Sequence, residues 1–227
     1  MKIEIYSDIH CPFCYLGKRR LELDLANMPG GDQVEILYRA YVLDPNAPKF
    51  SGKSVYQAQA DRKGMPVEEI EAAYRNIAEQ GKAYGLNYNM DAIIPTNTID
   101  ALALVQFAQE SELQSTVMEK LYEAYYTDGE NISDQEVLKR IATESGLDGS
   151  LVADVLNSGK YQQKVREDDA QIRQQKIEGI PYFIVNGTHK FFGSDQIAKV
   201  VEALRPKLQE IKPSSGMVCE GGICRMG

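Results

Sequence analysis

Two cysteines near the start of the chain, Cys11 and Cys14, are separated only by Pro12 and Phe13. On a helix this spacing puts Cys14 one turn behind Cys11, so the two thiols can close a short disulfide. The alternative is half of a zinc site, which needs a second pair of ligands at fixed spacing. No such pair lies nearby in the sequence. The C-P-F-C motif therefore favours thiol–disulfide chemistry.

The residues around this motif predict that it lies where a strand passes into a helix. Residues 3–7 are rich in β-branched and aromatic types, which favour a strand. After the motif, apolar residues such as Leu21 and Leu25 recur at helical spacing. Cys11 is then at a helix N-terminus, where free N–H groups and the helix dipole stabilise a thiolate, the nucleophilic form of the sulfur. Pro12 suits the first helical position.

The length and charge of the chain exclude several classes of protein. At 227 residues it can bury a hydrophobic core without help from disulfides. Its net charge is −8, from 25 basic and 33 acidic residues without a basic cluster, so nucleic acid is not an expected partner. No apolar run approaches membrane-spanning length, and Met1 is followed by a charged, alternating segment rather than a signal peptide. We therefore expect a cytoplasmic protein that does not bind membranes.

The rest of the pattern predicts an α/β fold with an all-helical domain inserted. Residues 33–38 read as a second strand, which would complete a right-handed βαβ unit with the first. Between residues 51 and 175 apolar residues recur at helical spacing only. Strand signals return at 181–185 and 189–192, separated by Asn186-Gly187, a strong hairpin signal. Residues 1–50 and 176–211 are predicted to form one α/β domain, and residues 51–175 an inserted helical domain. Residues 212–227 are predicted to form a flexible tail.

Two of the predicted helix starts depend on side-chain caps. Ser133 and Glu136 match a capping box ahead of an apolar helix. Ser194 and Asp195 follow a glycine and precede the last apolar stripe, so they are expected to cap the final helix. In each case a side-chain oxygen would satisfy a free backbone N–H group.

Three features together resemble the DsbA-like branch of the thioredoxin superfamily, most closely its cytoplasmic FrnE-type oxidoreductases. They are the C-P-F-C motif after the first strand, the Gly179-Ile180-Pro181 turn and the helical insertion between them. The resemblance implies a thioredoxin-like fold, with Cys11 as the solvent-facing attacking cysteine and Cys14 as the resolving one. It also implies a cis peptide bond before Pro181, and backbone hydrogen bonds from Ile180 to an extended substrate.

Two positions depart from that family. DsbA has a histidine between its cysteines that stabilises the thiolate, whereas this chain has Phe13. The family's buried acid, six residues before the leading cysteine, is replaced by Ile5. The proton-transfer partner of Cys14 is therefore open, with Glu4 and Asp8 nearby in the sequence.

The residues that flank the dithiol are predicted to contact the substrate: His10, Pro12, Phe13 and Ile180. His10 has two interpretations. It either supplies some of the missing electrostatic help beside Cys11, or it is a loop histidine exposed to solvent.

Ser194 and Asp195 also resemble a Gly-Ser-Asp segment of kappa-class glutathione transferases and related isomerases, which holds the γ-glutamyl end of glutathione. A helix N-terminus could receive the carboxylate of that group, and Asp195 its ammonium. An ordinary helix cap is the simpler interpretation. Those transferases have serine in place of the leading cysteine, so a complete dithiol favours disulfide exchange.

A second cysteine pair, Cys219 and Cys224, lies near the last residue. Gly221-Gly222 between them lets the chain fold back so that the two sulfurs can meet. From Glu210 to Cys219 an extended linker spans about 30 Å at ~3.3 Å per residue, enough to cross a small domain and reach Cys11. The pair is interpreted either as a second redox pair or guard for Cys11, or as a small closed loop.

The sequence thus predicts a thiol–disulfide oxidoreductase or isomerase in which Cys11 attacks a disulfide and Cys14 resolves the mixed disulfide. Its expected partners are disulfide- or thiol-containing proteins or small thiols. No cofactor is expected, except glutathione as a co-substrate, and no metal. Two alternatives stay open: a glutathione-dependent transferase or isomerase of the kappa-class type, and a non-catalytic, cysteine-rich metal-binding protein.

Overall fold

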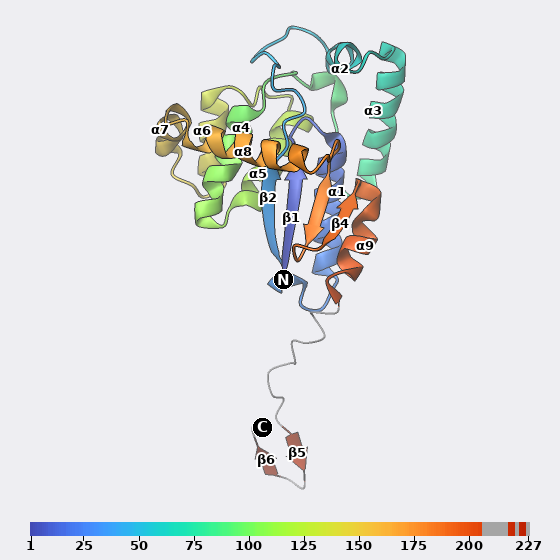
Figure 1. The fold of residues 1–227 in the computed structure, drawn as a ribbon, viewed down its shortest axis with the longest axis vertical. Coiled ribbons are helices and arrows are strands. Elements are labelled where there is room, and N and C mark those ends of the chain that lie inside the picture. The colour runs from blue at the N-terminus through green and yellow to red at the C-terminus, as the bar shows by residue number, and fades with distance from the viewer. Residues whose placement is uncertain (206–217, 221–222, 226–227) are drawn as a thin grey trace.

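A four-stranded mixed sheet lies at the centre of the fold (Figure 1). The computed structural model describes residues 1–205, 218–220 and 223–225. The strands of the sheet are β1 (Lys2–Ser7), β2 (Glu35–Ala40), β3 (Tyr182–Val185) and β4 (His189–Phe192). Their order is β2-β1-β3-β4, in which only the β1–β2 pair is parallel.

Helix α1 (Pro12–Ala26) joins β1 to β2 and completes the predicted βαβ unit. A short 3-10 helix, η1 (Gly31–Gln33), follows it. This turn needs glycine, because Gly30 has φ of 75° and a side chain on Gly31 would meet the carbonyl oxygen of Leu25 at 2.0 Å. Since η1 uses residue 33, β2 begins at Glu35, two residues later than predicted.

Strands β3 and β4 form the hairpin that the sequence predicted. Asn186, Gly187 and Thr188 connect them, because Val185 pairs with His189. Asn186 and Gly187 have φ of 50° and 74°, and the backbone N–H of Thr188 donates to the carbonyl oxygen of Val185 at 3.1 Å. A turn with positive φ at both central positions matches the right-handed twist of the strands that it joins.

The chain between β2 and β3 contains helices and no strand within the described residues, as predicted. The α-helices of this insertion alternate with short 3-10 turns, η2 (Met90–Ala92), η3 (Gln109–Ser111) and η4 (Gly149–Leu151). The α-helices are α2 (Val55–Lys63), α3 (Val67–Lys82), α4 (Ile99–Ala108), α5 (Gln114–Tyr126), α6 (Gln135–Glu144), α7 (Val152–Asn157) and α8 (Lys160–Gln174). After β4 come η5 (Ser194–Gln196) and α9 (Ile197–Glu202).

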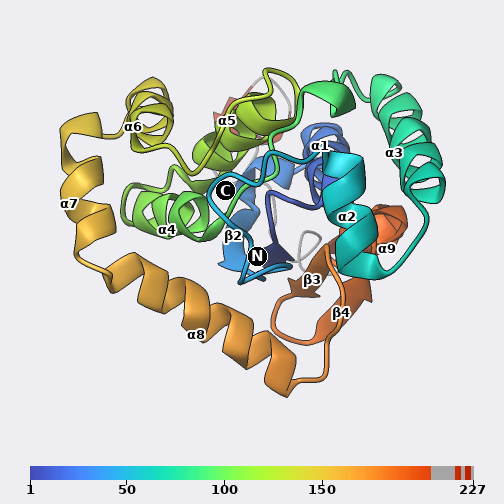
Figure 2. The same cartoon turned by 90° about the horizontal axis from the view of Figure 1, so that it is seen from above.

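The insertion wraps around the sheet and shares its core. Figure 2 shows α1 and α9 on one side of the sheet and α8 on the other. Helix α8 is tied to the end of β2 because Asp168 accepts a hydrogen bond from the backbone of Ala40 at 3.0 Å. Asp169 accepts one from the backbone of Val42 at 2.9 Å. The buried apolar residues of the sheet and of the insertion form one continuous cluster.

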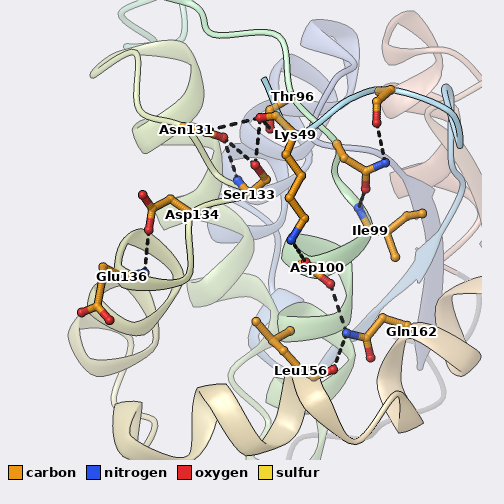
Figure 3. A network of polar contacts seen from close by, with 12 residues as sticks. Lys49, Thr96, Ile99, Asp100, Asn131, Ser133, Asp134, Glu136, Leu156 and Gln162 are labelled. Carbon is orange, nitrogen blue, oxygen red and sulfur yellow. Dashed lines mark hydrogen bonds and ion pairs between the residues drawn. The ribbon is translucent and has the colours of Figure 1, made fainter. Parts of the chain in front are cut away.

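The predicted capping box at Ser133 is wrong. Helix α6 is capped by Asp134, whose side chain accepts a hydrogen bond from the backbone N–H of Glu136 at 2.8 Å (Figure 3). The Ser133 hydroxyl instead lies 3.0 Å from the carbonyl oxygen of Lys49 and 2.8 Å from the side-chain oxygen of Asn131. Ser133 is buried, so these contacts satisfy its hydroxyl and leave the cap to its neighbour.

The cysteine-containing tail is described only in part. Strands β5 (Val218–Glu220) and β6 (Ile223–Arg225) pair antiparallel and set the backbones of Cys219 and Cys224 opposite each other. The rest of the predicted tail, including Gly221-Gly222, lies outside the described residues. No helix in the described part of the chain is both long and apolar enough to cross a membrane.

Candidate active site

The first strand and the first helix position the two cysteines. Cys11 is the N-cap residue of α1, with an extended backbone (φ −96°, ψ 106°), and Pro12 is the first helical residue. The backbone N–H of Cys11 donates to the carbonyl oxygen of Asp8 at 3.1 Å. That of Cys14 donates to the carbonyl oxygen of Cys11 at 2.9 Å. The predicted position of the dithiol at the start of the helix is confirmed.

Cys14 lies behind Cys11 and is almost completely buried. Its exposed fraction is 2 %, against 7 % for Cys11, and neither is in a disulfide. Burial raises the pKa of the Cys14 thiol well above its ordinary value, and a hydrogen bond with Cys11 raises it further. Hydrogen bonds from the Ser7 side chain and the Asp8 backbone lower it. Cys14 is thus a protonated thiol at neutral pH that needs assistance to act as a nucleophile.

The Ser7 hydroxyl, at the end of β1, lies between Cys14 and the helical insertion. Its oxygen is 2.7 Å from the phenol oxygen of Tyr122 on α5, and both side chains are buried. Burial raises the pKa of Tyr122, so the phenol keeps its proton and can donate it to Ser7. The Ser7 hydroxyl is then available to donate its own proton toward Cys14. No local pattern in the sequence indicates this contact, because 115 positions separate Ser7 from Tyr122.

Replacing Ser7 by alanine should slow the second step of disulfide exchange. Without the hydroxyl, the Cys14 thiolate loses a hydrogen bond worth about 1 kcal/mol, which corresponds to a rate about fivefold lower. Reaction of the reduced protein with 5,5′-dithiobis(2-nitrobenzoate) separates the steps. The first absorbance rise at 412 nm reports attack by Cys11, and the second, independent of concentration, reports resolution by Cys14.

Only the second phase should slow in Ser7→Ala. Because the pKa of Cys14 is raised, that phase should accelerate about tenfold per pH unit between pH 6 and pH 9, as the thiolate fraction grows. Tyr122→Phe should change the second phase in the same direction but less. A slower first phase in Ser7→Ala, with the second unchanged, would remove Ser7 from this role.

The structure places Asp8, and not Glu4, beside the dithiol. Asp8 is fully buried, and its carboxylate accepts hydrogen bonds from the backbone N–H groups of His10 at 3.2 Å and Leu43 at 2.7 Å. Glu4 instead pairs with Arg39 at 3.1 Å, and Arg39 also pairs with Asp168 of α8 at 3.4 Å. Asp8 therefore holds the loop that leads into the active site.

The loop before β3 faces the dithiol. The Cys11 thiol donates to the carbonyl oxygen of Ile180 at 3.7 Å, and the Ile180–Pro181 peptide bond is cis, as the resemblance implied. A side chain on Gly17, in α1, would lie 3.4 Å from both Pro181 and Ser194. The loop thus packs against the first helix next to the two cysteines.

The solvent-facing position implied for Cys11 is wrong. Cys11 lines a cavity of about 270 Å³ that also borders α2, α3 and the loop at Ile180. Residues of α2 and α3 line the same cavity, and the neighbouring Phe13 is 46 % exposed. An exposed position for His10 is wrong too, because it is buried in the wall of the same cavity.

The predicted cap at Ser194 and Asp195 is also wrong. Both residues lie inside the 3-10 turn η5, Gly193 is its N-cap, and no side chain caps either η5 or α9. Asp195 accepts a hydrogen bond from the side chain of its neighbour Gln196 at 2.7 Å, and Ser194 is buried. Neither residue lines the cavity at Cys11. The backbone reaches α9 through η5, which makes a side-chain cap unnecessary.

Tyrosines of the insertion also support the site. Tyr88 donates to the carbonyl oxygen of Pro12 at 2.8 Å and so anchors the first turn of α1. Tyr15 stacks on Tyr122, with ring centroids 4.7 Å apart. In the sequence these residues are indistinguishable from ordinary core tyrosines. The described residues hold no group of three or more side chains suited to bind a metal ion.

Comparison with known proteins agrees with this geometry. Residues 2–205 match the family of DSBA-like thioredoxin domains. The chain is 26 % identical over 191 residues to the uncharacterized protein YwbO of Bacillus subtilis, with 82 % of this chain and 87 % of YwbO covered.

Two solved structures share the fold. The probable DsbA oxidoreductase SCO1869 of Streptomyces coelicolor is 29 % identical, with a TM-score of 0.83 over 100 % of this chain and 99 % of that one. The cytosolic disulfide reductase DsbM of Pseudomonas aeruginosa, solved with glutathione, is 15 % identical, with a TM-score of 0.62 over 92 % and 100 % of the two chains. The chain therefore belongs to the family of DSBA-like thioredoxin domains.

Proposed function

We propose that the protein is a thiol–disulfide oxidoreductase that acts through Cys11 and Cys14. The Cys11 thiolate attacks a substrate disulfide and forms a mixed disulfide, and one substrate thiolate leaves. Cys14 then attacks the Cys11 sulfur, which releases the second substrate thiolate and closes the Cys11–Cys14 disulfide. The same steps in reverse oxidise a dithiol, and repeated exchange isomerises disulfides.

The observation that carries this proposal is the position of Cys11. It is the N-cap residue of α1, faces the carbonyl oxygen of Ile180, and has Cys14 hydrogen-bonded behind it. Phe13 offers the thiolate neither a charge nor a hydrogen bond. The reduced form should therefore be stabilised less than in DsbA, and we expect a potential of roughly −270 to −120 mV.

Equilibration of the full chain in glutathione buffers, followed by acid quench and mass spectrometry, tests this function. A Cys11–Cys14 disulfide should appear and disappear within that range of potentials, and the protein should accelerate reduction of insulin by dithiothreitol. A protein whose Cys11 and Cys14 never join, and that leaves insulin reduction unchanged, is not an oxidoreductase of this kind.

Glutathione is proposed as a co-substrate that reduces the Cys11–Cys14 disulfide. DsbM, which shares the fold, was solved with glutathione. The competing function is a kappa-class-type transferase or isomerase that holds glutathione at Ser194 and Asp195. Tight binding of reduced glutathione to the Cys11→Ser/Cys14→Ser double variant, lost in Asp195→Ala, would favour the transferase. Weak binding unaffected by Asp195→Ala would favour the oxidoreductase.

The proposed substrates are disulfide- or thiol-containing proteins and small thiols, and the proposed location is the cytoplasm. DsbM is a cytosolic disulfide reductase by name, and its fold is similar. A FrnE-type assignment within the family rests on the second cysteine pair and the helical insertion.

The second cysteine pair should exchange with the first. Strands β5 and β6 set the backbones of Cys219 and Cys224 opposite each other, as a disulfide requires. A tethered dithiol that reaches the site would have an effective concentration in the millimolar range. The test oxidises Cys11 and Cys14 with the tail reduced, quenches with acid and maps disulfides over time.

Transfer to the tail pair at a rate independent of protein concentration is the expected result. If transfer scales with protein concentration, or the tail pair stays reduced, the tail does not serve its own active site. Removal of residues 213–227 should then leave turnover unchanged.

A further inference from the structure

The cavity beside Cys11 is partly open to solvent and is bounded by three parts of the chain. Its volume is about 270 Å³, and it lies between the first turn of α1, the α2–α3 hairpin and the loop at Ile180. Cys11 forms part of its wall, so a molecule in the cavity lies within reach of the attacking sulfur. This volume can accommodate a small molecule.

One side of the cavity is apolar. Ile70, Tyr74 and Ile77 from α3 are buried in its wall, and Leu43 lines it from the loop after β2. These side chains gain free energy when they contact an apolar group rather than water. The body of the preferred occupant should therefore be apolar.

The last turn of α2 supplies positive charge. Arg62 and Lys63 both line the cavity, and none of the described residues that line it is acidic. Gln59 holds the guanidinium in place, since its side-chain oxygen accepts hydrogen bonds from Arg62 at 2.6 and 3.2 Å. Burial and the charge of Arg62 lower the pKa of Lys63, and Cys11 raises it, so Lys63 lies within electrostatic range of the sulfur. An anionic group is favoured here.

His10 forms part of the cavity wall next to Cys11. It is buried, and its ring centroid lies 5.7 Å from that of Tyr125.

We propose that the cavity binds small disulfides that combine an apolar, ring-sized body with a carboxylate, and presents their sulfur to Cys11. This proposal rests on the proposed function, in which Cys11 and Cys14 exchange disulfides. The Cys11 thiolate forms a bond to one substrate sulfur as the substrate S–S bond breaks and the other half leaves as a thiolate. Cys14 then displaces the first half, also as a thiolate, so two electrons pass from the dithiol to the substrate. Glutathione also offers carboxylates to the two cations, but its polar peptide backbone matches the apolar wall less well.

A pair of probes tests the charge preference. We measure the first-phase rate constants of the reduced full chain with 5,5′-dithiobis(2-nitrobenzoate), which carries carboxylates, and with neutral 4,4′-dithiodipyridine. In Arg62→Gln/Lys63→Gln the rate with the carboxylated probe should fall about tenfold, and that with the neutral probe less than about twofold.

The matched control is Arg75→Gln/Lys82→Gln, which removes two charges from exposed positions on α3 outside the cavity. It should change neither rate by more than about twofold. Equal effects of the two double variants would mean that only overall charge matters, which would overturn the proposal.

A binding measurement separates this proposal from the proposed function. The inert methyl thioether of 2-nitro-5-thiobenzoate is titrated by calorimetry into the Cys11→Ser/Cys14→Ser variant, which cannot exchange disulfides. Saturable binding, weakened about fivefold or more when Arg62→Gln/Lys63→Gln is added, supports the site even if the protein proves to be no oxidoreductase. No binding, or binding that the added changes leave intact, overturns the site. Stronger binding of reduced glutathione than of the thioether overturns the preference for an apolar body.

Discussion

Replacing Cys11 by serine should reduce disulfide exchange to the rate of the uncatalysed reaction. The first bond to the substrate forms at the Cys11 sulfur, and a serine hydroxyl in its place is not ionised near neutral pH. Cys14 cannot take over, because it is buried and its pKa is raised. The measurement is the reduction of insulin by dithiothreitol with equal amounts of native and variant protein.

Leu23→Ala serves as the control for this change. Leu23 lies on the same helix, is 42 % exposed and does not line the cavity at Cys11, so its loss should leave the activity unchanged. If Cys11→Ser retained turnover with protein disulfides, the attacking thiol would lie elsewhere in the chain. If the Cys11→Ser variant lost disulfide exchange but still catalysed the conjugation of glutathione, the protein would be a glutathione transferase.

Replacing Asp8 by alanine should destabilise the protein by about 3 kcal/mol, because two N–H groups that bind this fully buried carboxylate each lose their acceptor. These are the backbone groups of His10 and Leu43, which both line the cavity at Cys11. The loop that leads into α1 should also loosen, so the rate of attack by Cys11 should fall. Urea unfolding and the first phase of the reaction with 5,5′-dithiobis(2-nitrobenzoate) measure the two effects.

Asp44→Ala is the comparison for Asp8→Ala. Asp44 also accepts a backbone N–H, that of Asn46 at 3.1 Å, but it does so near the surface, where water replaces the lost bond. Asp44→Ala should lower the free energy of unfolding by less than about 1 kcal/mol. Equal stability losses in the two variants would show that burial of Asp8 does not matter.

Local patterns in the sequence were enough to predict the parts of the fold that depend on neighbouring residues. The strand before Cys11, the helix after it and the Asn186-Gly187 turn are all set by short-range backbone chemistry. The helical insertion follows from apolar spacing that never alternates between residues 51 and 175.

The predictions failed where a distant contact competes with a local one. Ser133 was expected to cap α6, but its hydroxyl is used by the carbonyl oxygen of Lys49, which is 84 positions away. In the same way, Cys11 contacts the loop at Ile180 and lines a cavity with residues of α2 and α3, and neither arrangement has a signal in the C-P-F-C motif. Side-chain spacing within one element does not report which other element packs on top of it.

The partner of Cys14 shows the same limit. The family acid is absent at Ile5, which is a sequence observation, but its replacement depends on the fold. Ser7 comes from the end of β1 and Tyr122 from the middle of the insertion, and only the packed structure brings their hydroxyls to 2.7 Å. A serine and a tyrosine so far apart carry no shared pattern.

The most direct test of the account is to trap the mixed disulfide in Cys14→Ser. The reduced variant is incubated with a protein disulfide substrate, quenched with acid and mapped by mass spectrometry. The account predicts that Cys11 joins covalently to a substrate cysteine and that the adduct persists, because no buried thiol remains to resolve it. Full turnover in Cys14→Ser, with Cys11 unmodified, would contradict the assignment of Cys11 as the attacking and Cys14 as the resolving cysteine.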